Sequence, residues 1–155
     1  MWLQVVSCGG NLLLNIAPTF DGFIMPVFQH LLAEIGSFMS TNGEAIYGST
    51  PWTVQNDTSS PNVWYTQQEN DGVPVVYACI TDHWPGVILE LSAPVATNST
   101  RVQLLGYPET LKWSYGQTMK ILMPNLAPDS QLRHGWVVKL EMLSIQSQSK
   151  MEDNE

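Results

Sequence analysis

Two different periods of hydrophobic residues divide the chain. The run over 10–16 is apolar almost without interruption, which is typical of a strand covered on both faces, as parallel strands are. A helix is expected over 25–40, because Pro26 suits a first helical turn and apolar residues then recur at spacings of three and four. A strand followed by such a helix is half of a βαβ unit, so its apolar faces need further elements to cover them.

From about residue 45 onward the hydrophobic period changes to two. Short alternating segments are separated by Gly, Pro, Asn or Asp, and this pattern predicts an antiparallel β-sandwich. The expected strands lie at residues 63–66, 74–80, 86–91, 101–105, 110–114, 118–123 and 135–142, with 45–52 as a lead-in. The sequence therefore predicts a mainly β chain with a strand-helix unit over 1–44, a sandwich over 45–145 and a polar tail over 146–155.

The charge balance changes the picture by excluding several functions. Fourteen acidic residues against six basic ones give a net charge of −8, and the basic residues are scattered, so nucleic-acid binding is not expected. The two cysteines, Cys8 and Cys79, and the three histidines show no metal-ligand spacing, so no metal site is expected. No apolar run is long enough to span a membrane, and the N-terminus lacks the basic region of a signal peptide.

Several motifs resemble those of α-L-fucosidases in the same order. The run over 6–18, followed by Asp21-Gly22, is similar to the last strand and loop of their catalytic (β/α)8-type barrel. The segment 42–47 resembles the link between that barrel and a C-terminal β-sandwich. Further similar segments lie at 51–52, 63–66, 76–78, 83–85 and 104–106, and at Trp136. The chain departs from the family at Ala17, where Gly is usual, and at Phe38, where Trp is common.

The resemblance implies retaining hydrolysis of α-linked L-fucose from glycoproteins and glycolipids. Such enzymes use two carboxyl groups about 5–5.5 Å apart, one as nucleophile and one as acid/base. In the family both precede residue 5, so no catalytic residue is expected in this chain, which should be inactive alone. The resemblance also implies no cofactor, a lysosomal or secreted location, and a homo-oligomer. The expected partners are the protein's own barrel domain and fucosylated glycans bound through that barrel.

Three local residues deserve comparison with that chemistry. Asp21 follows a predicted strand, but Asp-Gly is also ordinary turn chemistry, and that interpretation is favoured. Glu44 follows the helix and should lie at the opposite end of the barrel, where it supports the domain junction. Asn15, at the strand end, is the substrate-proximal candidate, and the alternative is that its amide satisfies loop backbone.

The remaining candidates are aromatic residues and glycosylation sequons. The tryptophans could stack on sugars, but the period of two places most of them in the sandwich interior; they are Trp52, Trp64, Trp84, Trp113 and Trp136. Sequons at Asn56 and Asn98 lie in predicted loops and are candidate N-glycosylation sites.

Two alternatives to an enzyme fragment stay open from the sequence. One is a stand-alone β-sandwich that binds glycans or another protein without catalysis. The other is a stable, folded isoform that has no enzymatic activity. The apolar strand and helix before residue 44 argue against the stand-alone sandwich, because they need a covering domain.

Overall fold

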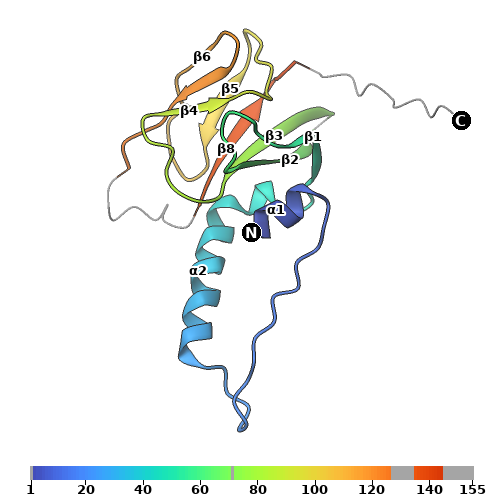
Figure 1. Cartoon of the computed structure of the whole chain (residues 1–155), viewed down its shortest axis with the longest axis vertical. Helices are drawn as coiled ribbons and strands as arrows, with labels where there is room; N and C mark the ends of the chain where they lie inside the picture. The colour runs from blue at the N-terminus through green and yellow to red at the C-terminus, as the bar shows by residue number, and fades with distance from the viewer. Residues whose placement is uncertain (1, 71, 127–134, 145–155) are drawn as a thin grey trace, which may run out of the picture.

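The computed structural model describes residues 2–70, 72–126 and 135–144. Figure 1 shows a β-sandwich from which a long helix and an extended segment project. The expected polar tail, 146–155, lies outside the described residues. One sheet has the antiparallel order β1-β2-β3-β8-β5 and the other has the order β4-β7-β6. The strands are β1 (Thr50–Asn56), β2 (Val63–Asn70), β3 (Val73–Ile80), β4 (Ile88–Leu91), β5 (Arg101–Leu104), β6 (Trp113–Tyr115), β7 (Met119–Leu122) and β8 (Trp136–Glu141).

The expected antiparallel sandwich is confirmed, and each predicted strand has a counterpart. The described part of the sandwich has one strand more than predicted: the expected lead-in over 45–52 continues into β1, a full edge strand beside β2. Pro51 is tolerated near its start because an edge strand can leave one backbone donor position unpaired. Polar residues dominate the second half of β1, so its alternation is too weak to mark a strand in the sequence.

The core between the two sheets is built from the inward-facing residues of nearly every strand. Its largest fully buried members include Tyr65, Leu89, Leu104, Ile121 and Leu140. Full burial of one such side chain contributes about 1.5–3 kcal/mol, so this cluster is the main source of stability. Burial in β4 and β7 alternates with exposure, which confirms the period-two interpretation for the three-stranded sheet.

Most of the tryptophans pack against this core, as predicted. Trp52 is buried edge-on against Tyr65, with ring centroids 4.9 Å apart. Trp84 and Trp136 are partly buried against the same cluster, and their ring centroids lie 5.1 Å apart. Trp113 also packs there, whereas Trp64 is half-buried outside this cluster.

A second apolar cluster covers the outer face of the five-stranded sheet. It joins α1 (Trp2–Ser7), which lies beside β1 and β2 (Figure 1), and the end of α2 (Pro26–Asn42) to outward-facing residues of β3 and β8. Trp2 meets Phe38 edge-to-face at 5.0 Å. Gly135 lies beneath Phe38, and a Cβ there would come within 2.9 Å of the ring at a φ of 123°, so only glycine suits this position.

The N-terminal unit differs from expectation in two ways. Helix α2 is confirmed and ends two residues beyond the predicted 25–40, whereas α1 was not predicted. The apolar run over 10–16 is extended but forms no ladder within the described residues, where Pro18 and Ile24 make an isolated bridge. A strand takes its backbone hydrogen bonds from neighbouring strands, and the described part of the chain offers this run none. Leu13 is consequently 92% exposed.

Candidate functional site

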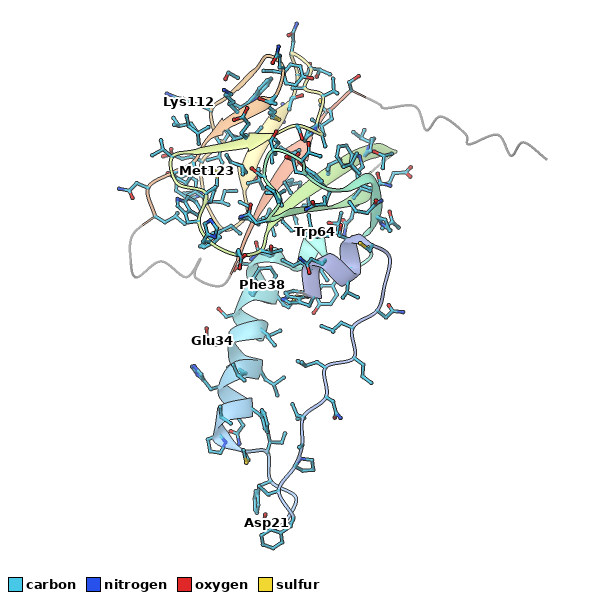
Figure 2. The ribbon with its side chains drawn as sticks, in the orientation of Figure 1. Asp21, Glu34, Phe38, Trp64, Lys112 and Met123 are labelled. Atoms are coloured by element: carbon cyan, nitrogen blue, oxygen red, sulfur yellow. The ribbon has the colours of Figure 1, made fainter. Side chains whose placement is uncertain are left out.

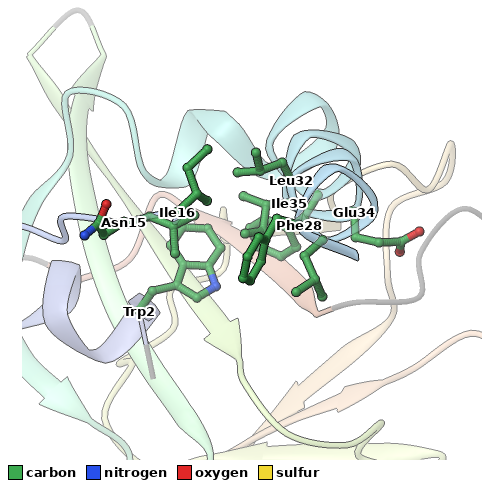
Figure 3. Close-up of a pocket in the computed structure, with 10 residues that line it drawn as sticks. Trp2, Asn15, Ile16, Phe28, Leu32, Glu34 and Ile35 are labelled. Atoms are coloured by element: carbon green, nitrogen blue, oxygen red, sulfur yellow. The ribbon is translucent and has the colours of Figure 1, made fainter. Parts of the chain in front are cut away.

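Asn15 lies beside an apolar cavity of about 400 Å³ between the extended segment and α2 (Figure 3). Apart from Asn15, Glu34 and the indole nitrogen of Trp2, the lining side chains are apolar. The Asn15 side chain is exposed, and Figure 3 shows its amide turned away from Phe28. This cavity has one carboxylate, from Glu34, so its chemistry suits packing rather than two-carboxylate catalysis.

Asp21 occupies the tip of a tight turn far from the sandwich (Figure 2). The backbone N–H of Gly22 donates to the carbonyl of Thr19 at 2.9 Å, and Gly22 has a φ of 86°. Thr19 and Phe23 close the turn through further backbone and hydroxyl hydrogen bonds. Glycine suits this left-handed position, so the structure accounts for Asp-Gly as turn chemistry.

Glu44 lies at the junction between α2 and the five-stranded sheet. Its Oε1 is 3.3 Å from Nζ of Lys139, which also lies 3.7 Å from Glu141. The side-chain amide of Gln68 donates to the Glu44 carbonyl at 2.6 Å. Burial raises the pKa of the neighbouring Tyr77 to about 12, with the carboxylates of Glu44 and Glu141 adding to the effect.

Asp21 and Glu44 therefore cannot act as a pair. They lie beyond opposite ends of α2, whose 17 residues span roughly 25 Å. A retaining glycosidase needs its carboxyl groups about 5–5.5 Å apart. Among the described residues there is also no His, Cys, Asp and Glu cluster that could hold a metal ion.

The most elaborate polar site of the described chain is one that the sequence reasoning missed. The carboxylate of Asp57 is fully buried. Its Oδ1 accepts from the backbone N–H groups of Ser59 and Ser60, both at 2.9 Å. Its Oδ2 accepts from the hydroxyl of Tyr65 at 2.7 Å, from the N–H and hydroxyl of Ser92, and from the N–H of Ala93. The carboxylate thus ties the β1–β2 loop to the end of β4.

The signal for this site was present in the sequence. An Asp followed by two serines favours a turn in which the carboxylate accepts from backbone N–H groups two and three residues on. The partners Ser92 and Ala93 are distant in the sequence and could not be inferred. Burial is the largest cause that raises the pKa of Tyr65 far above its ordinary value, and the nearby Asp57 carboxylate raises it further. The Tyr65 hydroxyl therefore keeps its proton and stays a hydrogen-bond donor.

The two sequons have different surroundings. The side-chain amide of Asn56 donates to the carbonyls of Pro61 at 2.8 Å and Val63 at 2.9 Å. Asn98 is exposed in the turn before β5. The hydroxyl of Thr100, the third sequon residue, donates to the carbonyl of Met142 at 2.9 Å.

The two cysteines are free thiols in different environments. Cys8 is exposed, whereas Cys79 is buried in β3. Burial raises the pKa of the Cys79 thiol to about 12, and a hydrogen bond with Thr66 partly offsets the effect. Within the described residues, no helix combines the length and apolar character needed to cross a membrane.

Solved structures share this arrangement of helix and sandwich. An alpha-fucosidase of Thermotoga maritima, in complex with a mechanism-based inhibitor, superposes with a TM-score of 0.71 at 23% identity, over 90% of this chain and 32% of that one. Alpha-L-fucosidase isoenzyme 1 of Paenibacillus thiaminolyticus superposes with a TM-score of 0.70 at 24% identity, over 92% of this chain and 33% of that one. The fold therefore defines a β-sandwich module with a preceding helical unit, of the kind these larger chains contain.

Sequence comparison carries the assignment further. A family model described as alpha-L-fucosidase matches residues 1–44, and one described as alpha-L-fucosidase C-terminal domain matches residues 55–141. The chain belongs to the alpha-L-fucosidase family. It is 45% identical to the tissue alpha-L-fucosidase of Bos taurus over 143 residues and 42% identical to that of Homo sapiens over 142. These matches cover 89% of this chain and 29% of each relative, so the chain spans less than a third of their length.

Proposed function

We propose that this chain forms the last strand-helix unit and the C-terminal sandwich of an enzyme that removes α-linked L-fucose from glycans with retention. The observation that carries the proposal is the pair of alpha-L-fucosidase models that match residues 1–44 and 55–141 in order. The first of these ranges ends at residue 44, which supports a domain boundary between residues 44 and 45. The end of α2 and the short helix η1 (Gly43–Ala45) meet the sheet at that point.

The catalytic carboxyl groups of such an enzyme come from outside these residues. Asp21 and Glu44 are too far apart to act together, and Lys139 already pairs with Glu44. Fucosylated glycans are then bound through the barrel, to which residues 1–44 contribute one unit. The two-carboxyl mechanism needs no metal or organic cofactor.

Asn15 is kept in this proposal as a substrate-proximal residue. Its exposed amide stands on the extended segment that the family resemblance places at the end of the last barrel strand. Strand ends on that face of a (β/α)8 barrel surround the active site. Its side chain is therefore available to a neighbouring group of the barrel or to the sugar.

The exposed apolar surface argues against a stand-alone binding module. Leu13, Phe20, Phe23, Val27 and Leu31 are all exposed large hydrophobic residues on the extended segment, its turn and α2. So many exposed large apolar side chains on one unit mark an interaction site rather than a free face. In the proposed enzyme this surface packs against the rest of the barrel.

Replacing Asp21 with Asn in the complete enzyme tests the assignment of no catalytic residue. We expect kcat/KM on an aryl α-L-fucoside to stay within about threefold of the wild type, which is less than 1 kcal/mol of transition-state stabilisation. The reason is that the turn is held by Gly22, Thr19 and Phe23 rather than by the carboxylate. A loss of several orders of magnitude with folding intact would show that Asp21 takes part in the chemistry.

Location and glycosylation form the next part of the proposal. The relatives include tissue and plasma alpha-L-fucosidases, which supports a lysosomal or secreted location. A secretory route would expose both sequons to glycosylation. Homo-oligomerisation, which the family resemblance implies, stays a prediction that light scattering on the complete enzyme can check.

Glycosylation at Asn56 and Asn98 can be tested one site at a time. In protein secreted from animal cells, Asn98→Gln and Asn56→Gln should each remove one glycan, seen as a smaller mass loss on treatment with an N-glycosidase. In protein made without glycosylation, Asn56→Gln should lower the free energy of unfolding by about 1 kcal/mol, because the unmodified Asn56 amide donates to two carbonyls. An untreated mass equal to that of the bare polypeptide would contradict the proposal.

A further inference from the structure

The outer face of the three-stranded sheet carries a groove that the fucosidase assignment does not use. Ile88, Glu90, Ser114, Lys120 and Leu122 share this face, because their cross-strand partners pair in register while Leu89 and Ile121 point into the core. The groove has a volume of about 300 Å³. It is lined mainly by Ile88, Lys112, Trp113, Ser114, Lys120 and Leu122.

The groove continues into a second, more polar hollow of about 360 Å³. The two hollows share Ser114 and Lys120, and the second adds Glu90, Tyr115 and Thr118. Ile88 and Leu122 are about half exposed, and Tyr115 is 43% exposed. The combined surface therefore offers apolar and aromatic contacts beside hydroxyl, ammonium and carboxylate groups, the mixture that contacts a sugar ring and its hydroxyls.

The charges of this face are unusual for so acidic a chain. Four cations lie in the described residues: Arg101, Lys112, Lys120 and Lys139. Two of the four line this one groove. Lys120 lies 3.8 Å from Glu90, which also accepts from the Thr118 hydroxyl at 2.6 Å, so that end is close to neutral. Lys112 has no ion pair with any described residue, and Figure 2 shows it on the side of the sandwich away from α2.

We propose that this groove binds a carboxylate-bearing sugar at the end of a glycan. The Lys112 ammonium pairs with the sugar carboxylate, and the Ser114 hydroxyl lies beside it in the groove. Ile88 and Leu122 contact the apolar face of the ring, and Glu90 accepts hydrogen bonds from the sugar hydroxyls. One cation without an ion pair to any described residue matches one negative charge. A carboxylate is preferred to a sulfate ester because esterification removes a hydroxyl donor that Glu90 can use.

The test is a titration of the complete protein with sialyllactose, lactose or sulfated lactose, in which binding is monitored by NMR. None of these probes contains fucose, so binding does not depend on the proposed hydrolytic activity. We expect sialyllactose to bind more tightly than either of the others. Lys112→Gln should weaken it about tenfold or more, the effect of losing a charge-assisted hydrogen bond. Lys112→Arg should retain binding.

Arg101→Gln is the matched control, because it removes an exposed cation from the five-stranded sheet. It should leave the affinity unchanged. Equal affinity for lactose and sialyllactose, equal or tighter binding of sulfated lactose, or equal losses in the Lys112→Gln and Arg101→Gln variants would overturn the proposal. So would a change of oligomeric state in Lys112→Gln, since the face would then join copies of the chain. Turnover of an aryl fucoside should be unaffected by Lys112→Gln, and a wild type without turnover would contradict only the proposed enzyme.

Discussion

Replacing Asp57 with Ala should lower the free energy of unfolding by roughly 3–5 kcal/mol, the largest effect expected for a single change in the sandwich. The buried carboxylate accepts six hydrogen bonds, and its loss leaves the N–H groups of Ser59, Ser60, Ser92 and Ala93 without that acceptor. Each donor left buried and unsatisfied costs about 1–3 kcal/mol, although some will reach water after local relaxation. Urea unfolding followed by tryptophan fluorescence measures the change.

Two variants separate the carboxylate from its individual partners. Tyr65→Phe removes one hydrogen bond and leaves the backbone donors satisfied, so it should cost about 1 kcal/mol. Asp57→Asn keeps one oxygen acceptor, so its loss of unfolding free energy should lie between those of Tyr65→Phe and Asp57→Ala. The three variants are compared in unglycosylated protein, because Asp57→Asn would add a second sequon in front of Thr58 and Ser59. If Asp57→Ala destabilises the chain no more than Tyr65→Phe does, the carboxylate does not tie the two loops together.

Leu13→Asp should have little effect on the stability of the 155-residue chain and a large effect on that of the complete enzyme. Leu13 is 92% exposed here, so in the 155-residue chain the change should alter the unfolding free energy by no more than about 0.5 kcal/mol. In the complete enzyme we propose that the run over 10–16 is a barrel strand covered on both faces. The same change then loses apolar burial and buries a carboxylate, at a cost of roughly 4 kcal/mol or more. Because whole domains are stable by only about 5–15 kcal/mol, most of the soluble, active enzyme should be lost.

Val87→Asp is the control for that comparison. Val87 is 68% exposed in the loop before β4, on the sandwich and away from the extended segment. It should be neutral in the chain and in the complete enzyme, as judged by thermal unfolding and by the yield of soluble protein. A complete enzyme that tolerates Leu13→Asp as well as Val87→Asp would show that the apolar run stays exposed, and the proposed barrel unit would fail.

The sequence predicted the sandwich well because its information is local. The continuous apolar run over 74–80 and the alternation over 135–142 mark strands whose inward residues, such as Val76 and Leu140, are buried. Helix α1 was not predicted, for a physical reason. The helix α1 has six residues and no acidic residue in its first turn, and it docks through Ser7, whose hydroxyl lies near the carbonyls of Gln55 and Tyr65. A contact of that kind cannot be inferred from local pattern.

The candidate site residues also show that local features could be predicted from the sequence, whereas contacts with distant residues could not. Asp21 as a turn residue followed from Asp-Gly itself, and its surroundings agree. The position of Glu44 beyond the end of α2 followed from helix length, but its partner Lys139 lies on a strand far along the chain. The Asp57 site depends on the approach of Ser92 and Ala93 from another strand end, so the sequence could predict the turn but not the network.

The most direct test of the proposed role is a hydrolysis assay with an aryl α-L-fucoside on two proteins. The first is the purified 155-residue chain, and the second is the same chain joined behind the preceding residues of a tissue-type relative. We predict no turnover above background for the first and clear turnover for the second, because the two carboxyl groups of retaining hydrolysis are contributed by the joined barrel. Fucoside hydrolysis by the 155-residue chain alone, retained after repurification, would contradict this account.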